Sequence, residues 1–238
     1  MSHEIFEQQA SEWWNEEGPF KLLHRLNPVR LQYIKNLICE HNKGDLHNLK
    51  VIDIGCGGGI LTIPIARMGM TVHGLDPGEK NIEIAKKTSL EAQLNIEYHT
   101  DFLENITSLI EHKEQYDVVT CMEVLEHVQD YRLFLIHLCK LVKPGGLLFL
   151  STINRTIKSF THAIVFAEYI AKIVSKGTHE WSKFIKPSEL VEIAKICDCT
   201  LTNLIGVQLN PFKKEWNTSE DVSINYMMCL KKNINIQS

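Results

Sequence analysis

The chain has 238 residues, of which 44% are apolar and 23% are charged, and these values are ordinary for a globular domain. Its net charge of −4 excludes the basic surface that general nucleic-acid binding requires. Seven scattered cysteines argue against a disulfide framework. The polar N-terminus lacks the order of a signal peptide, and no apolar run is long enough to span a membrane. We therefore expect a cytoplasmic protein.

In chain order, residues 1–47 are predicted to form one or two helices, with Pro28 opening the second. Strand and helix patterns alternate through residues 50–155, which predicts a cofactor-binding core with a mostly parallel sheet. Residues 156–185 follow the fifth strand as a helical insertion, and residues 186–231 supply a helix and edge strands. The expected strands are 51–54, 71–75, 95–99, 117–121, 147–152, 200–209 and 224–231. Residues 1–238 should therefore form one α/β domain, with a seven-stranded sheet and helices on both faces.

The glycine-rich segment after the first strand is the strongest local signal. Gly55, Gly57 and Gly59 allow a tight turn and a close approach of the backbone to a ligand. Asp76 follows at the carboxyl end of the second strand, where an acid can accept hydrogen bonds from ribose hydroxyls. Because the loop contains no lysine or arginine for a phosphate, this pattern favours a nucleoside ligand over a nicotinamide or flavin dinucleotide. An ordinary glycine turn is the remaining alternative.

A second group of polar residues follows the fourth strand. If this segment is helical, Glu123, Glu126 and His127 lie on one face, because they are spaced three and four residues apart. Two carboxylates and an imidazole could bind a divalent ion with open positions. His127 could instead act as a general base without a metal, or the cluster could only cap a helix.

The insertion has an amphipathic pattern. Phe160, Ile164 and Ile170 recur at helical spacing, and Lys158 and Lys172 lie near the edges of this stripe. A helix of this kind could lie in the plane of a membrane surface, where lysines meet anionic headgroups. The alternative is a helix that packs on the core of its own domain.

Several segments together resemble the bacterial ubiquinone biosynthesis O-methyltransferases, related to a mitochondrial enzyme. The most specific are Cys-Met-Glu-x-Leu-Glu-His at residues 121–127 and Lys-Gly-Thr-His at 176–179. The others are residues 20–24, 27–31, 116–128, 141–146, 151–155, 167–169 and 183–190, so that the resemblance runs from about Phe6 to Leu230. It implies the Rossmann-like fold of class I methyltransferases, with S-adenosylmethionine as the cofactor.

The resemblance also implies particular contacts and a reaction. The cofactor contacts of the family fall on Arg30, Gly55, Asp76 and Met122, and the loop pattern adds Gly57. The family methylates phenolic hydroxyls of polyprenylated rings, namely 2-polyprenyl-6-hydroxyphenol and 3-demethylubiquinol. The related mitochondrial enzymes use an equivalent Glu-x-x-Glu-His segment to bind magnesium, so Mg²⁺ is a candidate for this chain.

The expected partners follow from this chemistry. They are the polyprenylated phenol, the inner face of the cytoplasmic membrane as a peripheral contact, and other quinone-biosynthesis enzymes. Two rival hypotheses remain: a methyltransferase for another small phenol, and a non-catalytic cofactor-binding scaffold within a quinone-biosynthesis assembly.

Overall fold

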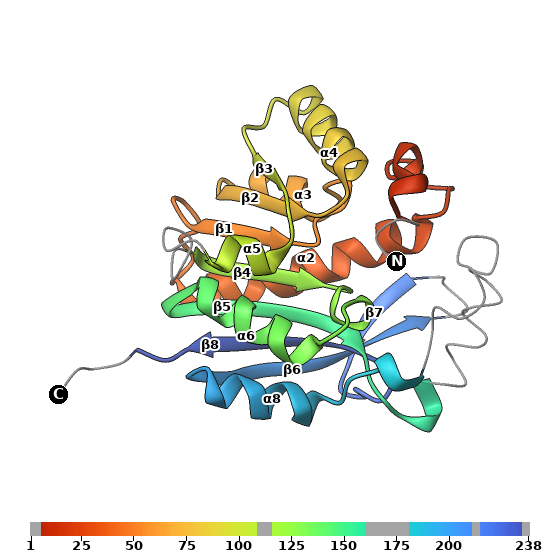
Figure 1. Cartoon of the computed structure of the whole chain (residues 1–238). Helices are drawn as coiled ribbons and strands as arrows, with labels where there is room; N and C mark the ends of the chain where they lie inside the picture. Colours follow the sequence, from red (N-terminus) through yellow and green to blue (C-terminus); the bar gives the residue numbers. More distant parts are fainter. Residues whose placement is uncertain (1–5, 109–115, 160–180, 211–214, 235–238) are drawn as a thin grey trace.

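The computed structural model describes residues 6–108, 116–159, 181–210 and 215–234. Within them, eight strands form one sheet in the order β3-β2-β1-β4-β5-β8-β6-β7 (Figure 1). The strands are β1 (Lys50–Ile54), β2 (Thr71–Asp76), β3 (Glu97–Thr100), β4 (Tyr116–Met122), β5 (Val142–Ile153), β6 (Cys199–Asn210), β7 (Glu215–Ser219) and β8 (Asn225–Lys232). The first five are parallel, and the last three pair antiparallel.

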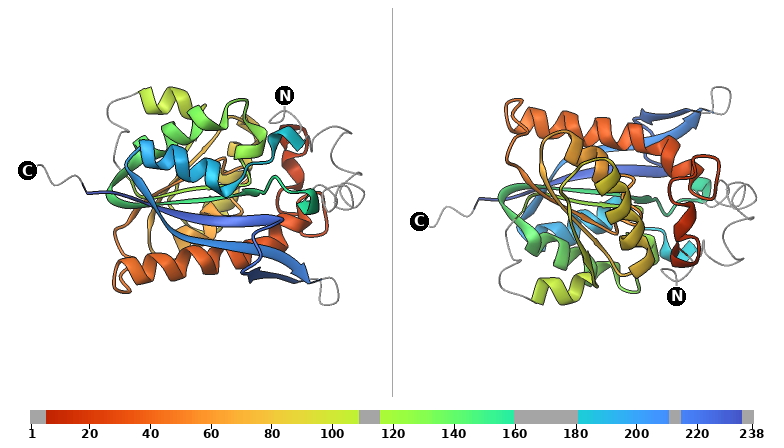
Figure 2. Two further views of the ribbon diagram at one scale, coloured as in Figure 1. Left: turned by 90° about the horizontal axis from the view of Figure 1, so that it is seen from below. Right: turned by 90° about the horizontal axis from the view of Figure 1, so that it is seen from above.

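Helices cover both faces of this sheet, as Figure 2 shows. They are α2 (Lys21–His41), α3 (Thr62–Arg67), α4 (Glu79–Glu91), α5 (Leu103–Ser108), α6 (Tyr131–Leu141) and α8 (Pro187–Ile196), with short 3-10 turns η1 (Ala10–Glu12), η3 (Leu125–His127) and η4 (Trp181–Lys183). Helix α2 packs on one face, and α6 and α8 pack on the other. The predicted α/β fold is confirmed, with the strand order of a doubly wound sheet.

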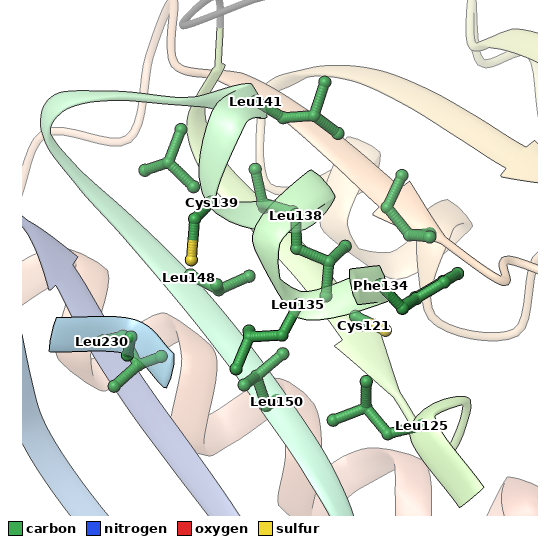
Figure 3. Close-up of a cluster of buried hydrophobic side chains, with 14 of the residues drawn as sticks. Cys121, Leu125, Phe134, Leu135, Leu138, Cys139, Leu141, Leu148, Leu150 and Leu230 are labelled. Carbon is green, nitrogen blue, oxygen red and sulfur yellow. The ribbon is translucent and has the colours of Figure 1, made fainter. Parts of the chain in front are cut away.

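The larger core lies between the sheet and helices α6 and α8. Its centre is drawn in Figure 3, where Leu135, Leu138 and Cys139 of α6 lie against Leu148 and Leu150 of β5. The buried residues of α6 recur at intervals of three and four, so one face of this helix lies against the sheet. This packing holds β4 and β5 in place, and the candidate site lies where β4 ends.

Two of the sequence predictions about elements were wrong. Pro28 lies inside α2, which begins at Lys21, rather than opening a helix. The sheet has an eighth strand, β7, which pairs with β6 and lies beyond the two expected antiparallel strands, β8 and β6. Glu215–Ser219 contains one apolar side chain, the buried Trp216, so its alternation is too weak to be recognised in the sequence.

The insertion predicted at residues 156–185 is described only in part. Phe160, Ile164, Ile170 and Lys172 lie outside the described residues. Lys158 is described, and it forms an ion pair with Asp221. No helix in the described ranges is long and apolar enough to cross a bilayer.

Candidate functional site

The glycine loop connects β1 to α3 at the carboxyl edge of the sheet. Gly55 and Gly57 have positive φ values of 73° and 52°, in the region that glycine adopts without strain. The amide of Gly55 donates a hydrogen bond to the carbonyl of Leu75 at 2.8 Å, which holds the loop against the end of β2. The loop therefore has the conformation that its sequence predicts.

Asp76 is a buried carboxylate at the end of β2. It accepts hydrogen bonds from the amides of Gly57 at 3.0 Å and Gly78 at 2.9 Å, and from the side-chain amide of Asn81 at 3.0 Å. These donors hold the carboxylate beside the glycine loop. Asn81 was not predicted as a site residue, because an asparagine in the first turn of a helix is common without any such role.

Trp13 packs on the glycine loop from the N-terminal segment. A Cβ atom at Gly57 would lie 2.5 Å from the indole, and one at Gly58 would lie 2.4 Å from it, so only glycine fits beneath this ring. The indole N–H donates to Oδ1 of Asn81 at 2.8 Å. The ring also stacks on Phe20, with centroids 3.9 Å apart. Trp13 thus forms part of the site, although its sequence context did not predict this.

Arg30 lies on α2 and is only 5% exposed, although it carries a permanent charge. Its Nη2 atom lies 3.3 Å from a carboxylate oxygen of Glu123. Among the described residues, Nε and Nη2 of Arg30 still have no hydrogen-bond partner. A buried guanidinium with unused donors can receive a further anionic group, such as a carboxylate, in a bidentate pair.

Glu123, Glu126 and His127 do not share one helical face, because the segment is not helical at Glu123, as that expectation required. The amide of Glu123 still donates to the carbonyl of Ser151, which keeps this residue attached to β5 after β4 ends. Its φ of 59° then turns the chain, and only Leu125–His127 form a helical turn.

The three side chains consequently have separate environments. Glu123 accepts a hydrogen bond from the hydroxyl of Ser151 at 2.7 Å, and Glu126 accepts one from Thr152 at 2.8 Å. Burial, together with a smaller contribution from the charge of Glu123, raises the pKa of Glu126 to about 8. The ring of His127 contacts the ring of Phe6 edge-on, with centroids 5.5 Å apart.

This arrangement does not fit a divalent ion. Within the described residues, one group of three metal-ligating side chains has all its ligand atoms within 4.8 Å of one another, and it does not include Glu123, Glu126 or His127. One oxygen of Glu123 lies beside the cation Arg30, and one oxygen of Glu126 accepts the hydroxyl of Thr152, so each carboxylate already has a partner of its own.

Asp53 and Met122 are buried at the same edge. Asp53 accepts hydrogen bonds from the hydroxyls of Thr62 and Thr120 at 2.6 and 2.7 Å, and its burial raises its pKa to about 6. It links β1, β4 and α3 beneath the glycine loop. Met122 is the last residue of β4, and its side chain is buried in the same apolar cluster as Leu26.

A cavity of about 230 Å³ lies at the opposite edge of the sheet. Its lining includes Ile38, Asp117 and Lys143, and it contains none of the predicted site residues. Lys143 and Asp117 form an ion pair there at 2.9 Å. We place the functional site at the carboxyl edge, where the polar groups described above converge.

Comparison with known proteins agrees with this geometry. Residues 16–202 match the model of a family described as a methyltransferase domain. The chain is 44% identical over 233 residues to a ubiquinone biosynthesis O-methyltransferase of Methylobacterium nodulans, covering 95% of this chain and 92% of the relative. An enzyme with the same name from a Shewanella species is 45% identical over 227 residues, covering 95% and 93%.

Solved structures share the fold at lower identity. A magnesium protoporphyrin IX methyltransferase from Synechocystis with bound SAH superposes with a TM-score of 0.67 at 20% identity, covering 98% of both chains. A SAM-dependent methyltransferase from Thermotoga maritima has a TM-score of 0.65 at 17% identity, covering 97% of this chain and 99% of the other.

Proposed function

The chain belongs to the family of ubiquinone biosynthesis O-methyltransferases, and we propose that it methylates a phenolic hydroxyl of polyprenylated catechol and hydroquinone intermediates. The observation that carries this proposal is the meeting of three groups at one sheet edge. These are the glycine loop, the Asp76 carboxylate and the buried Arg30 with unused donors.

These groups suit S-adenosylmethionine, the cofactor of the family. Asp76 would accept hydrogen bonds from the ribose hydroxyls, and Gly55 and Gly57 would allow the close approach of the backbone. Arg30 would bind the carboxylate of the methionine part, and the backbone of Met122 would border the same space. When bound, the cofactor supplies an electrophilic methyl group on a sulfonium sulfur.

The acceptor hydroxyl must lose its proton for this reaction. A phenol has a pKa of about 10, so only roughly one molecule in a thousand is ionised at neutral pH. We propose that His127 takes this proton as the general base. Glu123 is paired with Arg30 and Glu126 is kept protonated by burial, so neither is as well placed to accept it.

The membrane contact is a further part of this proposal. A polyprenylated substrate is nearly insoluble in water, so the enzyme must bind its ring at a bilayer surface. The sequence of residues 156–176, with its apolar stripe and lysines, supports a peripheral contact with the inner face of the cytoplasmic membrane. Other quinone-biosynthesis enzymes are candidate partners there.

Incubation with labelled S-adenosylmethionine and two acceptors tests the function. We expect label in a prenylated catechol in preference to a soluble phenol without a prenyl chain. Preference for the soluble phenol would support the rival acceptor. Tight cofactor binding without transfer to either compound would support the non-catalytic scaffold.

A further inference from the structure

Three metal-ligating side chains lie together on β2 and β3, away from the cofactor edge. His73 of β2 is paired in register with Glu97 of β3, and His99 lies two residues further along β3. Paired residues of parallel strands, and residues two apart on one strand, project from the same face of a sheet. The ligand atoms of His73, Glu97 and His99 accordingly all lie within 4.8 Å of one another.

The carboxylate of Glu97 reaches both imidazoles. Its Oε2 atom lies 3.8 Å from Nε2 of His73, and its Oε1 atom lies 3.2 Å from Nε2 of His99. The two rings are 5.8 Å apart between centroids and inclined by 31°. The same nitrogen of each histidine therefore faces the space beside the carboxylate, as ligands of a shared ion do.

The other ring nitrogen of His73 faces a buried hydroxyl. Nδ1 lies 3.3 Å from the hydroxyl oxygen of Tyr116, a residue that is only 1% exposed. A proton on Nδ1 that is donated to this oxygen leaves the lone pair on Nε2. Metal-bound histidines characteristically hold their second nitrogen in this way, which fixes both the tautomer and the orientation of the ring.

The exposure of the three side chains suits an ion that enters from solution. The side chains of His73 and His99 are 12% and 27% exposed, whereas that of Glu97 is 62% exposed. Water can therefore reach the open side and complete the coordination.

We propose that His73, Glu97 and His99 bind a zinc ion that links the edge strand β3 to β2. Two imidazoles and one carboxylate, with water in the fourth position, form a ligand set typical of tetrahedral zinc. Magnesium and calcium prefer oxygen ligands throughout and fit this group less well. The site is separate from the cofactor site, because His73 precedes Asp76 by three residues and projects from the other face of β2.

The ion would act on stability rather than on the methyl transfer. Helix α4 and strand β3 follow β2, and Asn81 of α4 holds the Asp76 carboxylate. An ion that links β2 to β3 would therefore stabilise the segment formed by β2, α4 and β3. A ligand that binds only the folded chain stabilises it by an amount that grows with the logarithm of the ligand concentration relative to its Kd, so the unfolding temperature rises as ligand is added.

Titration of the untagged full-length protein with zinc chloride tests this site, with cobalt(II) as a spectroscopic substitute. We expect one equivalent to bind, with absorption typical of nitrogen and oxygen ligands and no thiolate charge-transfer band. His73→Asn and His99→Asn should each weaken zinc binding at least 100-fold, and Tyr116→Phe about tenfold, the loss typical of a group that orients a ligand. His47→Asn, a change at an exposed loop histidine, should leave the affinity unaltered.

Thermal unfolding in the absence of metal shows whether each variant is folded. His99→Asn changes the more exposed of the two histidines, so it should disturb the fold less than His73→Asn. Zinc should raise the unfolding temperature of the parent protein and of His47→Asn, but not that of His99→Asn. Equal zinc affinity in the parent and in the double variant His73→Asn, His99→Asn would overturn the proposal. A thiolate band, or a loss of binding in His127→Asn, would place the ion elsewhere and would also overturn it.

Discussion

The indole of Trp13 and the side chain of Asn81 are joined by a hydrogen bond of 2.8 Å, although 68 residues separate them in the chain. The amide of Asn81 in turn donates to Asp76 at 3.0 Å. The N-terminal segment is thus connected through one side chain to the carboxylate that we assign to the ribose. Substitutions along this connection should act on cofactor binding.

Replacing Asp76 by alanine should weaken S-adenosylmethionine binding at least tenfold. The change removes up to two charge-assisted hydrogen bonds to the ribose, each worth about 1.5–3 kcal/mol. Calorimetric titration measures the effect, and circular dichroism shows whether the variant is folded. Asp45→Ala, at an exposed aspartate, is the control and should bind normally. An unchanged affinity in Asp76→Ala would show that Asp76 does not bind the ribose.

Replacing Arg30 by lysine should affect only ligands that carry the amino-acid carboxylate. A lysine keeps the charge but cannot form a bidentate pair, so S-adenosylhomocysteine should bind at least tenfold more weakly. Methylthioadenosine, which lacks that carboxylate, should bind about as well as it does to the parent protein. Arg67→Lys, at an exposed arginine, controls for the substitution itself. An equal loss for both ligands would mean that Arg30 acts on the shape of the site instead.

Replacing His127 by alanine should lower turnover by about 100-fold or more, while cofactor affinity changes little. This magnitude is typical of the loss of a general base. A chelator should leave the activity of the parent enzyme unaffected. The chelator test is repeated in His99→Asn, so that an ion between β2 and β3 cannot account for the result. Activity that is lost with chelator and restored by magnesium would favour a metal at Glu123, Glu126 and His127.

The stability of the protein should fall as the pH rises from about 4.5 to about 8. Burial raises the pKa of Glu126 from 4.5 to about 8, so in this window the folded chain binds a proton that the unfolded chain has released. Urea unfolding near the two ends of the window measures the change. Glu126→Gln resembles the protonated form and should flatten the dependence between about pH 6 and pH 8, above the range in which the raised pKa of Asp53 contributes, whereas the exposed Glu83→Gln should keep it. An unchanged slope in Glu126→Gln would show that other groups cause it.

Vesicles with anionic lipids should bind the protein, and binding should fall with salt. Each lysine near the surface contributes about 1 kcal/mol at low ionic strength. Phe160→Asp combined with Ile164→Asp should abolish sedimentation with the vesicles, yet spare the methylation of a short-chain soluble catechol. A double variant that still sediments would exclude this segment as the anchor.

Much of the fold could be predicted because its signals are local. The glycine spacing, the acid at the end of the second strand and the alternating apolar runs each depend on neighbouring residues. They predicted the loop at Gly55 and Gly57 and the parallel core, and the structure confirms both. The eighth strand was missed because its residues, Glu215–Ser219, become a strand only through pairing with β6.

The sequence by itself determined the class of fold, the cofactor loop and the residues available for chemistry, since these depend on backbone preferences and burial within single segments. Only the tertiary structure decided which side chains meet. It placed Trp13 on the glycine loop, paired Arg30 with Glu123, and separated Glu123 from Glu126 by keeping the former bonded to β5. It also brought His73 beside Glu97 and His99, because register between strands is set by the packing of the whole sheet and leaves no mark in the spacing of either strand.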